Sequence, residues 1–170
     1  PDGLWEINSM TYKADTTDDV YRRSLYVVVK RSVPNPTLAT FDAPSRSSCV
    51  VRRQRTNTPL QALVTLNDPT FLEAAKVLGA HMANEKDPEK SIVLAYRSLT
   101  GRKPLDKELI LLRALYESEF KKFKSNPDKT KGWLDAGMYK LDPTLDQAHI
   151  AAHAVVAITI LNSDATLTKR

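Results

Sequence analysis

The sequence predicts an all-α fold, a single-domain bundle of five or six helices over residues 1–170, and three observations favour it. Four Thr-Pro or Asp-Pro pairs punctuate the chain, and apolar residues at helical spacing follow each pair. A side-chain oxygen at the N-cap accepts an orphan backbone N–H, and proline at the first helical position has no N–H to lose. The chain of 170 residues is 42% hydrophobic and 26% charged, which is enough for one domain with a real core.

These pairs predict helix starts at Thr58, Asp68, Asp87 and Asp142, and Gly101 is expected to end the third helix. The last helix, Asp142 to Asn162, is apolar around most of its circumference and should therefore lie at the centre of the bundle. The residues that the four helices are expected to bury are, in order, Leu60, Leu63 and Val64; Leu72, Ala75, Leu78 and Met82; Ile92, Ala95, Tyr96 and Leu99; Leu145, Ala148, Ala152 and Val156.

Two further helices are expected without such a pair. One begins near Asp106, ends before Pro127, and has an apolar stripe that includes Leu112 and Phe123. The other is Asp18 to Ser32, although the β-branched run at 27–29 leaves a strand open as an alternative. The lysines between 121 and 131 are expected on a solvated helix face and in the loop after it.

The segment from Ser32 to Thr56 is expected to be long and irregular, because Pro34, Pro36 and Pro44 prevent any long helix. Long loops without secondary structure are uncommon in compact domains and tend to be functional or disordered. Phe41, Val50 and Val51 favour a segment that is packed on the outside of the bundle rather than loose.

The run from Cys49 to Phe71, CVVRRQRTNTPLQALVTLNDPTF, joins an arginine cluster to two successive helix starts. It resembles the signature of a planctomycete-type domain of unknown function. That domain is found at the C-terminal end of large exported bacterial proteins whose N-terminal parts look like c-type cytochromes. The resemblance also takes in GLW at 3–5, YRRSLY at 21–26, TFDAP at 40–44 and the ending 161–168, although Ser163 and Ala165 depart from it. It implies an extracytoplasmic location, in the periplasm or at the cell surface, and it transfers no catalytic residue.

Several classes of function are disfavoured by the sequence itself. The longest apolar run, Ile150 to Leu161, is far shorter than the roughly 20 residues of a membrane helix. Cys49 is the single cysteine, so there is neither an internal disulfide nor a C-x-x-C-H haem attachment site, and no cofactor is expected in this domain. The chain begins at Pro1 without an export signal, which we interpret as the mark of a fragment or a processed product.

The arginine cluster is the main candidate binding site. Its residues lie in a run, 43–67, that contains no carboxylate. In one interpretation they bind an anion, such as an acidic or sulfated polysaccharide, beside the helix start at Thr58. In the other they hold the long loop to carboxylates such as Asp18, Asp19 or Asp68 and to helix C-terminal carbonyls. Nucleic acid is not expected, because no recognised motif or broad basic face with aromatic platforms occurs. The candidate binding residues are Arg46, Arg52, Arg53, Arg55 and Asn57.

Other candidates have a structural interpretation beside the functional one. Asp146, His149 and His153 share one helix edge and could form half of a metal site, but an apolar helix favours neutral core histidines, and no metal is expected. Cys49 is more typical of a small hydrophobe than of a nucleophile. The aromatic residues Trp5, Tyr12 and Trp133 either form a sugar-stacking platform or cover the ends of the bundle.

Three functional hypotheses follow. The first is a noncatalytic interaction or scaffolding domain whose partners are other domains of the same larger protein. The second is an anion- or carbohydrate-binding module that uses the arginine cluster. The third is an enzyme with an unrecognised site, although no catalytic residue can be named from the sequence.

Overall fold

Helix α7, Gln147–Leu161, forms the centre of the helical bundle in the computed structural model of the chain. The structure describes residues 15–27, 29 and 34–167. Nine of the fifteen residues of α7 are buried, and they lie on every side of the helix. A helix that is apolar all round is stable only when other helices surround it. The predicted central position of the last helix is therefore confirmed.

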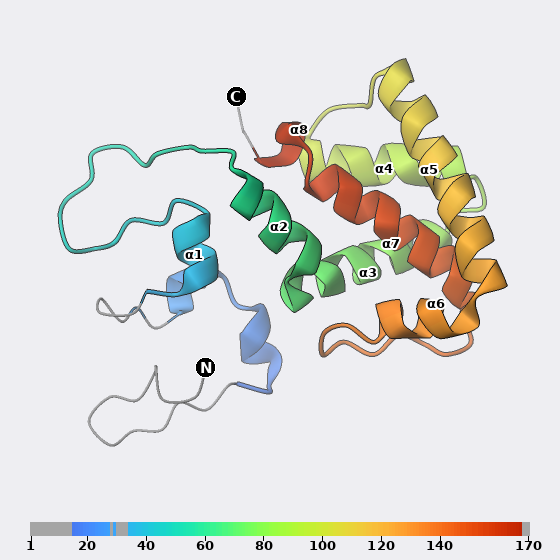
Figure 1. Cartoon of the computed structure of the whole chain (residues 1–170), viewed down its shortest axis with the longest axis horizontal. Helices are drawn as coiled ribbons and strands as arrows, with labels where there is room; N and C mark the ends of the chain where they lie inside the picture. Colours follow the sequence, from blue (N-terminus) through green and yellow to red (C-terminus); the bar gives the residue numbers. More distant parts are fainter. Residues whose placement is uncertain (1–14, 28, 30–33, 168–170) are drawn as a thin grey trace. The chain divides into compact units, whose positions relative to one another are not determined.

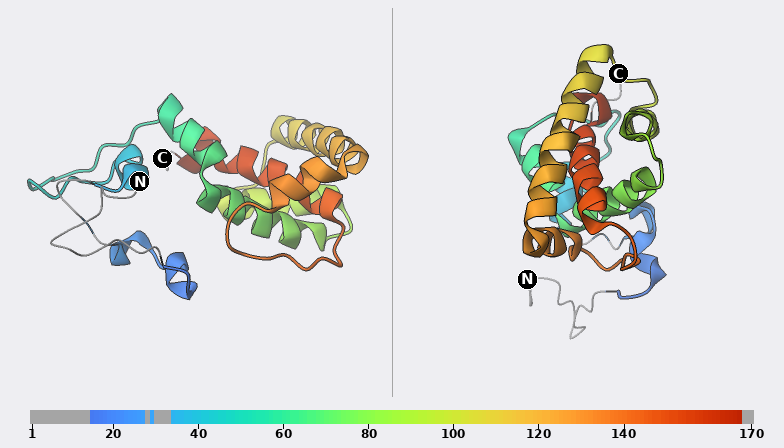
Figure 2. Two further views of the ribbon diagram at one scale, coloured as in Figure 1. Left: turned by 60° about the horizontal axis from the view of Figure 1, so that its bottom comes forward. Right: turned by 90° about the vertical axis from the view of Figure 1, so that its right-hand side faces the viewer.

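Four helices enclose α7: α3 (Pro69–Ala83), α4 (Pro88–Thr100), α5 (Asp106–Ser125) and α6 (Pro127–Leu134). The most extensive contacts of α7 are with α3 and α5, and Figure 2 shows it between them. Helix α2 (Pro59–Asn67) contacts α3 and α7, and the short helix α8 (Asp164–Leu167) follows α7 (Figure 1). The described residues contain helices and no strands, so the predicted all-α fold is confirmed.

The chain divides into two compact units, residues 1–56 and 57–170. The bundle is the second unit. In the first, the described residues form the 3₁₀ helices Asp18–Tyr21 and Ser24–Tyr26 and the helix α1, Pro36–Thr40. The expectation of one domain over the whole chain, with 32–56 packed on its outside, stays a prediction.

Three predicted helix starts are confirmed. The Thr58 hydroxyl accepts from Gln61 N–H at 3.3 Å, and the Gln61 side chain accepts from Thr58 N–H at 3.0 Å, which completes a capping box. Asp68 accepts from Thr70 N–H and begins α3, and Asp87 accepts from Glu89 N–H and begins α4. Gly101 ends α4 with φ of 77°, in the left-handed region that glycine adopts without strain.

The fourth predicted start is wrong. Helix α7 begins at Gln147, and its cap is Asp146, whose carboxylate accepts from the N–H groups of Ala148 and His149. Asp142 instead accepts from the N–H and hydroxyl of Thr144, so its side chain closes a local turn and does not begin a helix.

Two Asn-Pro pairs begin helices that were not predicted. Asn35 caps α1, and Asn126 caps α6 by accepting from Lys129 N–H. Pro127 lies beyond the end of α5, as expected, and is also the first residue of α6. Asparagine caps as well as aspartate does, so the pairs have the same physical meaning.

The predicted helix from Asp18 to Ser32 is also wrong over its described part. Residues 18–21 and 24–26 form two separate 3₁₀ helices, and neither buries a side chain. A longer helix gains most of its stability from a buried apolar face, which this segment lacks. Residues 28 and 30–33 lie outside the described part of the chain.

Helix α2 faces the opposite way to the prediction. It buries Gln61 and Thr65, whereas Leu60 and Leu63 are 55% and 58% exposed. Gln61 is held inward by the capping box, and the Thr65 hydroxyl donates to the Gln61 carbonyl at 2.8 Å. The leucines of α2 therefore lie on the surface. The expectation that Val50 and Val51 are packed down is wrong as well, since both are exposed.

Gly79 allows α3 and α7 to approach closely. A Cβ at this position would lie 2.7 Å from Ala154 N and 2.8 Å from the Ile150 carbonyl oxygen. Both of these are backbone atoms of the central helix, which cannot move aside without shifting α7. Within the described ranges, no helix has the length and hydropathy to cross a membrane.

Candidate functional site

The loop after α1 that carries Arg46, Arg52, Arg53 and Arg55 is bound to the end of α1 by the side chain of Arg53. Its Nε donates to the Asp42 carbonyl oxygen at 3.1 Å, and its Nη2 donates to the Phe41 carbonyl oxygen at 3.0 Å. Thr56 donates its N–H and its hydroxyl to the Asp42 carboxylate. Asp42 has φ of 58°, and these bonds hold both its backbone and its side chain. Arg53 thus has helix-end carbonyls as partners, as in the structural interpretation, and its part in anion binding stays a prediction.

The other candidate arginines are exposed. Arg46 has φ of 58°, and the side chains of Arg46 and Arg52 form no hydrogen bond or ion pair with another residue in the described part of the chain. Two of the three carboxylates that were suggested as partners have other contacts: Asp19 pairs with Arg22 at 2.7 Å, and Asp68 caps α3. Binding of an anion by Arg46 and Arg52 stays a prediction.

Asn57 belongs to the bundle. Its Nδ2 donates to the Asp164 Oδ1 atom at 3.3 Å, which links the residues before α2 to the first residue of α8. This contact joins positions 107 residues apart in sequence. Bracing of the helix start, which was the structural interpretation of Asn57, is what the geometry shows.

His153 is fully buried in the centre of the bundle with hydrogen bonds at both ring nitrogens. Its Nδ1 lies 3.0 Å from the His149 carbonyl oxygen, so Nδ1 carries the proton of the neutral ring, and Nε2 lies 3.0 Å from Ser91 Oγ. The Pro88 carbonyl oxygen also lies 2.8 Å from Ser91 Oγ, so the single proton of this hydroxyl is shared between two acceptors, Pro88 O and His153 Nε2. Burial, together with the nearby His149 ring, lowers the pKa of His153 to about 4, although the backbone bond opposes the change.

The distance between Ser91 and His153 suits a serine nucleophile and its base. Both side chains are completely buried, however, so a substrate has no access to the hydroxyl in this structure. Tyr116 covers the same imidazole, with ring centroids 4.4 Å apart. The pair is part of the core packing of α4, α5 and α7.

The three residues of the possible metal half-site each have a different structural contact. Asp146 caps α7, His153 forms the contacts above, and the His149 ring packs edge-on against Tyr116 and Phe120. Among the residues that the structure describes, no group of three His, Cys, Asp or Glu side chains is placed to hold a metal ion. Cys49 is an exposed free thiol. Trp133 packs against the core, and the other two aromatic candidates, Trp5 and Tyr12, lie outside the described residues.

Lys76 is a buried charged residue that sequence analysis did not single out. It is 1% exposed, and its Nζ donates to the carbonyl oxygens of Leu134, Ala136 and Tyr139 at 3.2, 2.6 and 2.8 Å. Burial lowers the pKa of the Lys76 ammonium, and nearby Glu73 opposes this. The signal in the sequence was a single lysine within the apolar stripe of α3.

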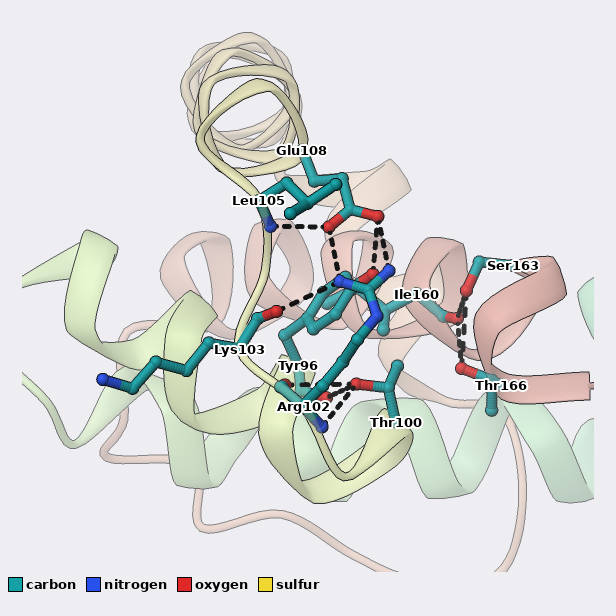
Figure 3. Close-up of polar contacts among 9 residues, drawn as sticks. All are labelled: Tyr96, Thr100, Arg102, Lys103, Leu105, Glu108, Ile160, Ser163 and Thr166. Atoms are coloured by element: carbon teal, nitrogen blue, oxygen red, sulfur yellow. Dashed lines mark hydrogen bonds and ion pairs between the residues drawn. The ribbon is translucent and has the colours of Figure 1, made fainter. Parts of the chain in front are cut away.

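Glu108 is the centre of a second polar cluster, between α4 and α5 (Figure 3). Its carboxylate receives two bonds from Arg102, at 2.8 and 2.9 Å, and one each from the Tyr96 hydroxyl and Leu105 N–H. The Arg102 guanidinium also lies over the Tyr96 ring, 4.9 Å from its centroid. The bonds from Arg102 lower the pKa of Glu108 to about 2. The available sequence signal was a glutamate three residues into a predicted helix start.

These observations define an all-α bundle in which the buried polar side chains described above bond to one another and to the backbone, whereas Asn162 Oδ1 is buried and has no hydrogen-bond partner within the described chain. Residues 5–116 match the model of the PSD1 family, whose description is a protein of unknown function (DUF1553), and the chain belongs to this family. The match includes α1 to α4 and more than half of α5, and it ends before the central helix α7. No curated protein and no solved structure shows significant similarity to the chain.

Proposed function

We propose that the chain is a noncatalytic interaction or scaffolding domain of a larger, exported, cytochrome-linked bacterial protein, called the parent protein below. The observation that carries this proposal is the use of the bundle's interior polar groups. His153 and Lys76 are the groups with altered pKa values deepest in the bundle, and each is hydrogen-bonded within the fold and inaccessible to a substrate. Strongly perturbed groups mark catalytic sites most convincingly when they line an open cleft, so this arrangement supports a structural role.

The resemblance of residues 49–71 to the planctomycete-type domain supports the rest of the proposal. It favours an extracytoplasmic location and the other domains of the parent protein as partners, and the single cysteine favours a domain without a cofactor of its own. The exposed leucines of α2, which lie within the same resembling run, are consistent with a surface that another domain covers.

The test is association between this chain and the remainder of the parent protein, produced as two separate polypeptides. Isothermal titration calorimetry should show saturable binding. Separate migration of the two on gel filtration, together with no heat of binding at about 100 μM, a concentration that detects all but the weakest contacts, would contradict the proposal. The conversion of a substrate by the isolated chain, lost in Ser91→Ala with its fold intact, would favour the enzyme hypothesis instead.

A second candidate, an anion- or carbohydrate-binding module, is favoured by one observation. Arg46 and Arg52 are exposed and form no bond within the described part of the chain. Their guanidinium groups are therefore available for a sulfate or a uronic acid. Calorimetric titration with a sulfated oligosaccharide tests this candidate: Arg52→Met should abolish binding without a change in melting temperature, whereas equal binding by both proteins would remove it.

A further inference from the structure

One end of the bundle carries most of the net positive charge of the chain. Residues 121–140, called the lysine end below, include the last turn of α5, all of α6 and the start of the loop between α6 and α7 (Figure 1). They contain six lysines and two aspartates, a net charge of +4, whereas the whole chain has +5. All six lysines are exposed: Lys121, Lys122, Lys124, Lys129, Lys131 and Lys140.

Five of these six lysines form no hydrogen bond or ion pair within the described part of the chain. The exception, Lys122, pairs with Glu119 at 2.6 Å, and the five include Lys129, Lys131 and Lys140. Basic residues in the last turn of a helix stabilise its dipole, which accounts for part of the pattern. It accounts for Lys131 but not for Lys129, which lies in the first turn of α6, or for Lys140, which lies in the loop after α6.

Two side chains of α3 bind the backbone of the loop after α6 and fix its conformation. The buried Lys76 ammonium binds three of its carbonyl oxygens, and the Glu73 carboxylate accepts from Met138 N–H. Gly137 has φ of 79°, and a Cβ at this position would lie 2.0 Å from Glu73 Oε2, so the loop fits only with glycine here. Burial of charged groups in a fold is costly, even where hydrogen bonds offset part of the cost.

This fixed loop presents two large side chains to solvent. Met138 and Tyr139 are each 48% exposed, although the backbone of Tyr139 is bound by Lys76 and that of Met138 by Glu73. Methionine and tyrosine are enriched in protein interfaces, and a conformation fixed before binding reduces the entropy that is lost on association. The loop therefore combines two apolar contact residues with a preorganised backbone.

We propose that the lysine end binds an acidic segment of a protein partner, with an apolar side chain of that segment packed against Met138 and Tyr139. The inference rests on the interaction function proposed above and names its surface and the chemistry of its partner. The unpaired lysines attract the acidic residues over a distance of about one Debye length, and the two loop side chains supply the short-range contact.

A protein partner fits this surface better than a polysaccharide or a nucleic acid. No arginine occurs between positions 113 and 170, so the lysine end lacks the planar guanidinium groups that bind sulfate, carboxylate or phosphate with two parallel bonds. Trp133 packs against the core, which leaves Tyr139 without a second exposed aromatic ring among residues 121–140 for sugar or base stacking. The lysine ammonium groups act as point charges that attract carboxylates, and Met138 and Tyr139 supply the apolar contact area beside them.

Fluorescence anisotropy with two labelled peptides tests the proposal on the full chain. One probe is a run of glutamates with a central tryptophan, and the other is the same peptide with glutamate at that position. We expect the tryptophan probe to bind more tightly, and Tyr139→Ser to reduce its affinity about tenfold, as for an interface anchor. The affinity of the all-glutamate probe should change little in this variant.

Matched charge variants separate the lysine end from the chain's overall charge. Lys129→Gln with Lys131→Gln should weaken both probes and reduce their salt dependence, whereas Lys103→Gln with Lys107→Gln, which removes two exposed lysines at the other end of α5, should not. All four positions are exposed, so these variants should fold. Lys76→Met, if it folds, should remove the preference for tryptophan and leave the salt dependence unchanged, because Lys76 positions the loop and does not face the probe.

Three outcomes would overturn the proposal: no binding of either peptide, equal weakening by both lysine pairs, or tighter binding of heparin or a single-stranded oligonucleotide than of the tryptophan probe. If the peptides fail and the chain still associates with the remainder of the parent protein, only this surface is wrong. If that association is absent too, the interaction function itself is wrong.

Discussion

Mild acid should destabilise the bundle through His153 before most carboxylates titrate. The folded protein holds the pKa of His153 at about 4, whereas an unfolded chain has the ordinary value of 6.5. The unfolded state therefore binds the proton first as the pH falls. The contribution of the neutral ring to stability is complete above about pH 6.5 and is lost progressively toward about pH 4, the opposite of a histidine stabilised by a carboxylate.

The magnitude follows from the difference in pKa. Each unit corresponds to about 1.4 kcal/mol, so the limiting loss is about 3 kcal/mol, and about 2 kcal/mol is already lost at about pH 5. Such a loss is large beside a typical unfolding free energy of about 5 to 15 kcal/mol. The cause is the burial of a ring that is 0% exposed, with Tyr116 against one face.

Urea denaturation at closely spaced values between about pH 7 and pH 4.5 measures this effect, with His153→Gln as the control because it removes the titrating ring and retains a hydrogen-bonding amide. We expect the wild type to lose stability steeply and the variant to have a nearly flat profile down to about pH 5, where carboxylates begin to titrate. The reasoning is refuted if the two profiles run parallel. It is also refuted if the NMR resonances of the His153 ring titrate near 6.5 in the folded protein.

Four further substitutions test the fold. Thr58→Ala or Asp68→Ala should each lower the unfolding free energy by about 0.5 to 2 kcal/mol, because each removes a helix cap, and unchanged urea midpoints would show that these caps contribute nothing. Gly79→Ala should cost about 1 to 3 kcal/mol by forcing a methyl group against the backbone of α7 at Ala154, so a melting temperature at or above that of the wild type would contradict the close approach. Glu108→Gln should cost about 1 kcal/mol near neutral pH, since its ion pair is partly exposed, and should remove the decline in stability that we expect as the pH falls from about 4.5 toward 2; a decline of wild-type size in the variant would contradict this.

The presence of most helices could be predicted from the sequence, because a capping residue, a proline and an apolar stripe are local signals. Thr58, Asp68 and Asp87 each place a cap before proline and an apolar stripe, and the structure has a helix at each. The same logic failed at Asp142, whose carboxylate bonds to Thr144 in a turn. A capping side chain and a turn-forming side chain are chemically the same, and only the packing of α7 selects Asp146 as its cap.

The direction that a helix faces was less predictable. The leucines of α2 form an apolar stripe, yet Gln61 and Thr65 are buried in their place. Gln61 is turned inward by its bond to Thr58 N–H, a combination of capping and tertiary packing that hydrophobic periodicity does not capture. The α3, α4 and α5 stripes, which compete with no such bond, are buried or half-buried as predicted.

The candidate site likewise contained one contact that the sequence suggested and one that it could not. Arg53 binds carbonyls at the end of α1, as the structural interpretation allowed, because helix-end carbonyls are acceptors wherever a loop returns to them. The role of Lys76 depends on three carbonyls about 60 residues further along the chain, and local sequence contains no information on such contacts. The loop that Lys76 holds could therefore be recognised only from the structure.

Zero-length carbodiimide crosslinking of the intact parent protein, followed by mass spectrometry, tests the interaction account most directly, because this reagent joins a lysine amine only to a carboxylate in contact with it. The account predicts crosslinks from Lys129, Lys131 or Lys140 to aspartates or glutamates of another domain, and none from Lys103 or Lys107 at the opposite end of α5. Interdomain crosslinks at Lys103 and Lys107 alone, or no interdomain crosslink from any of these lysines, would contradict it.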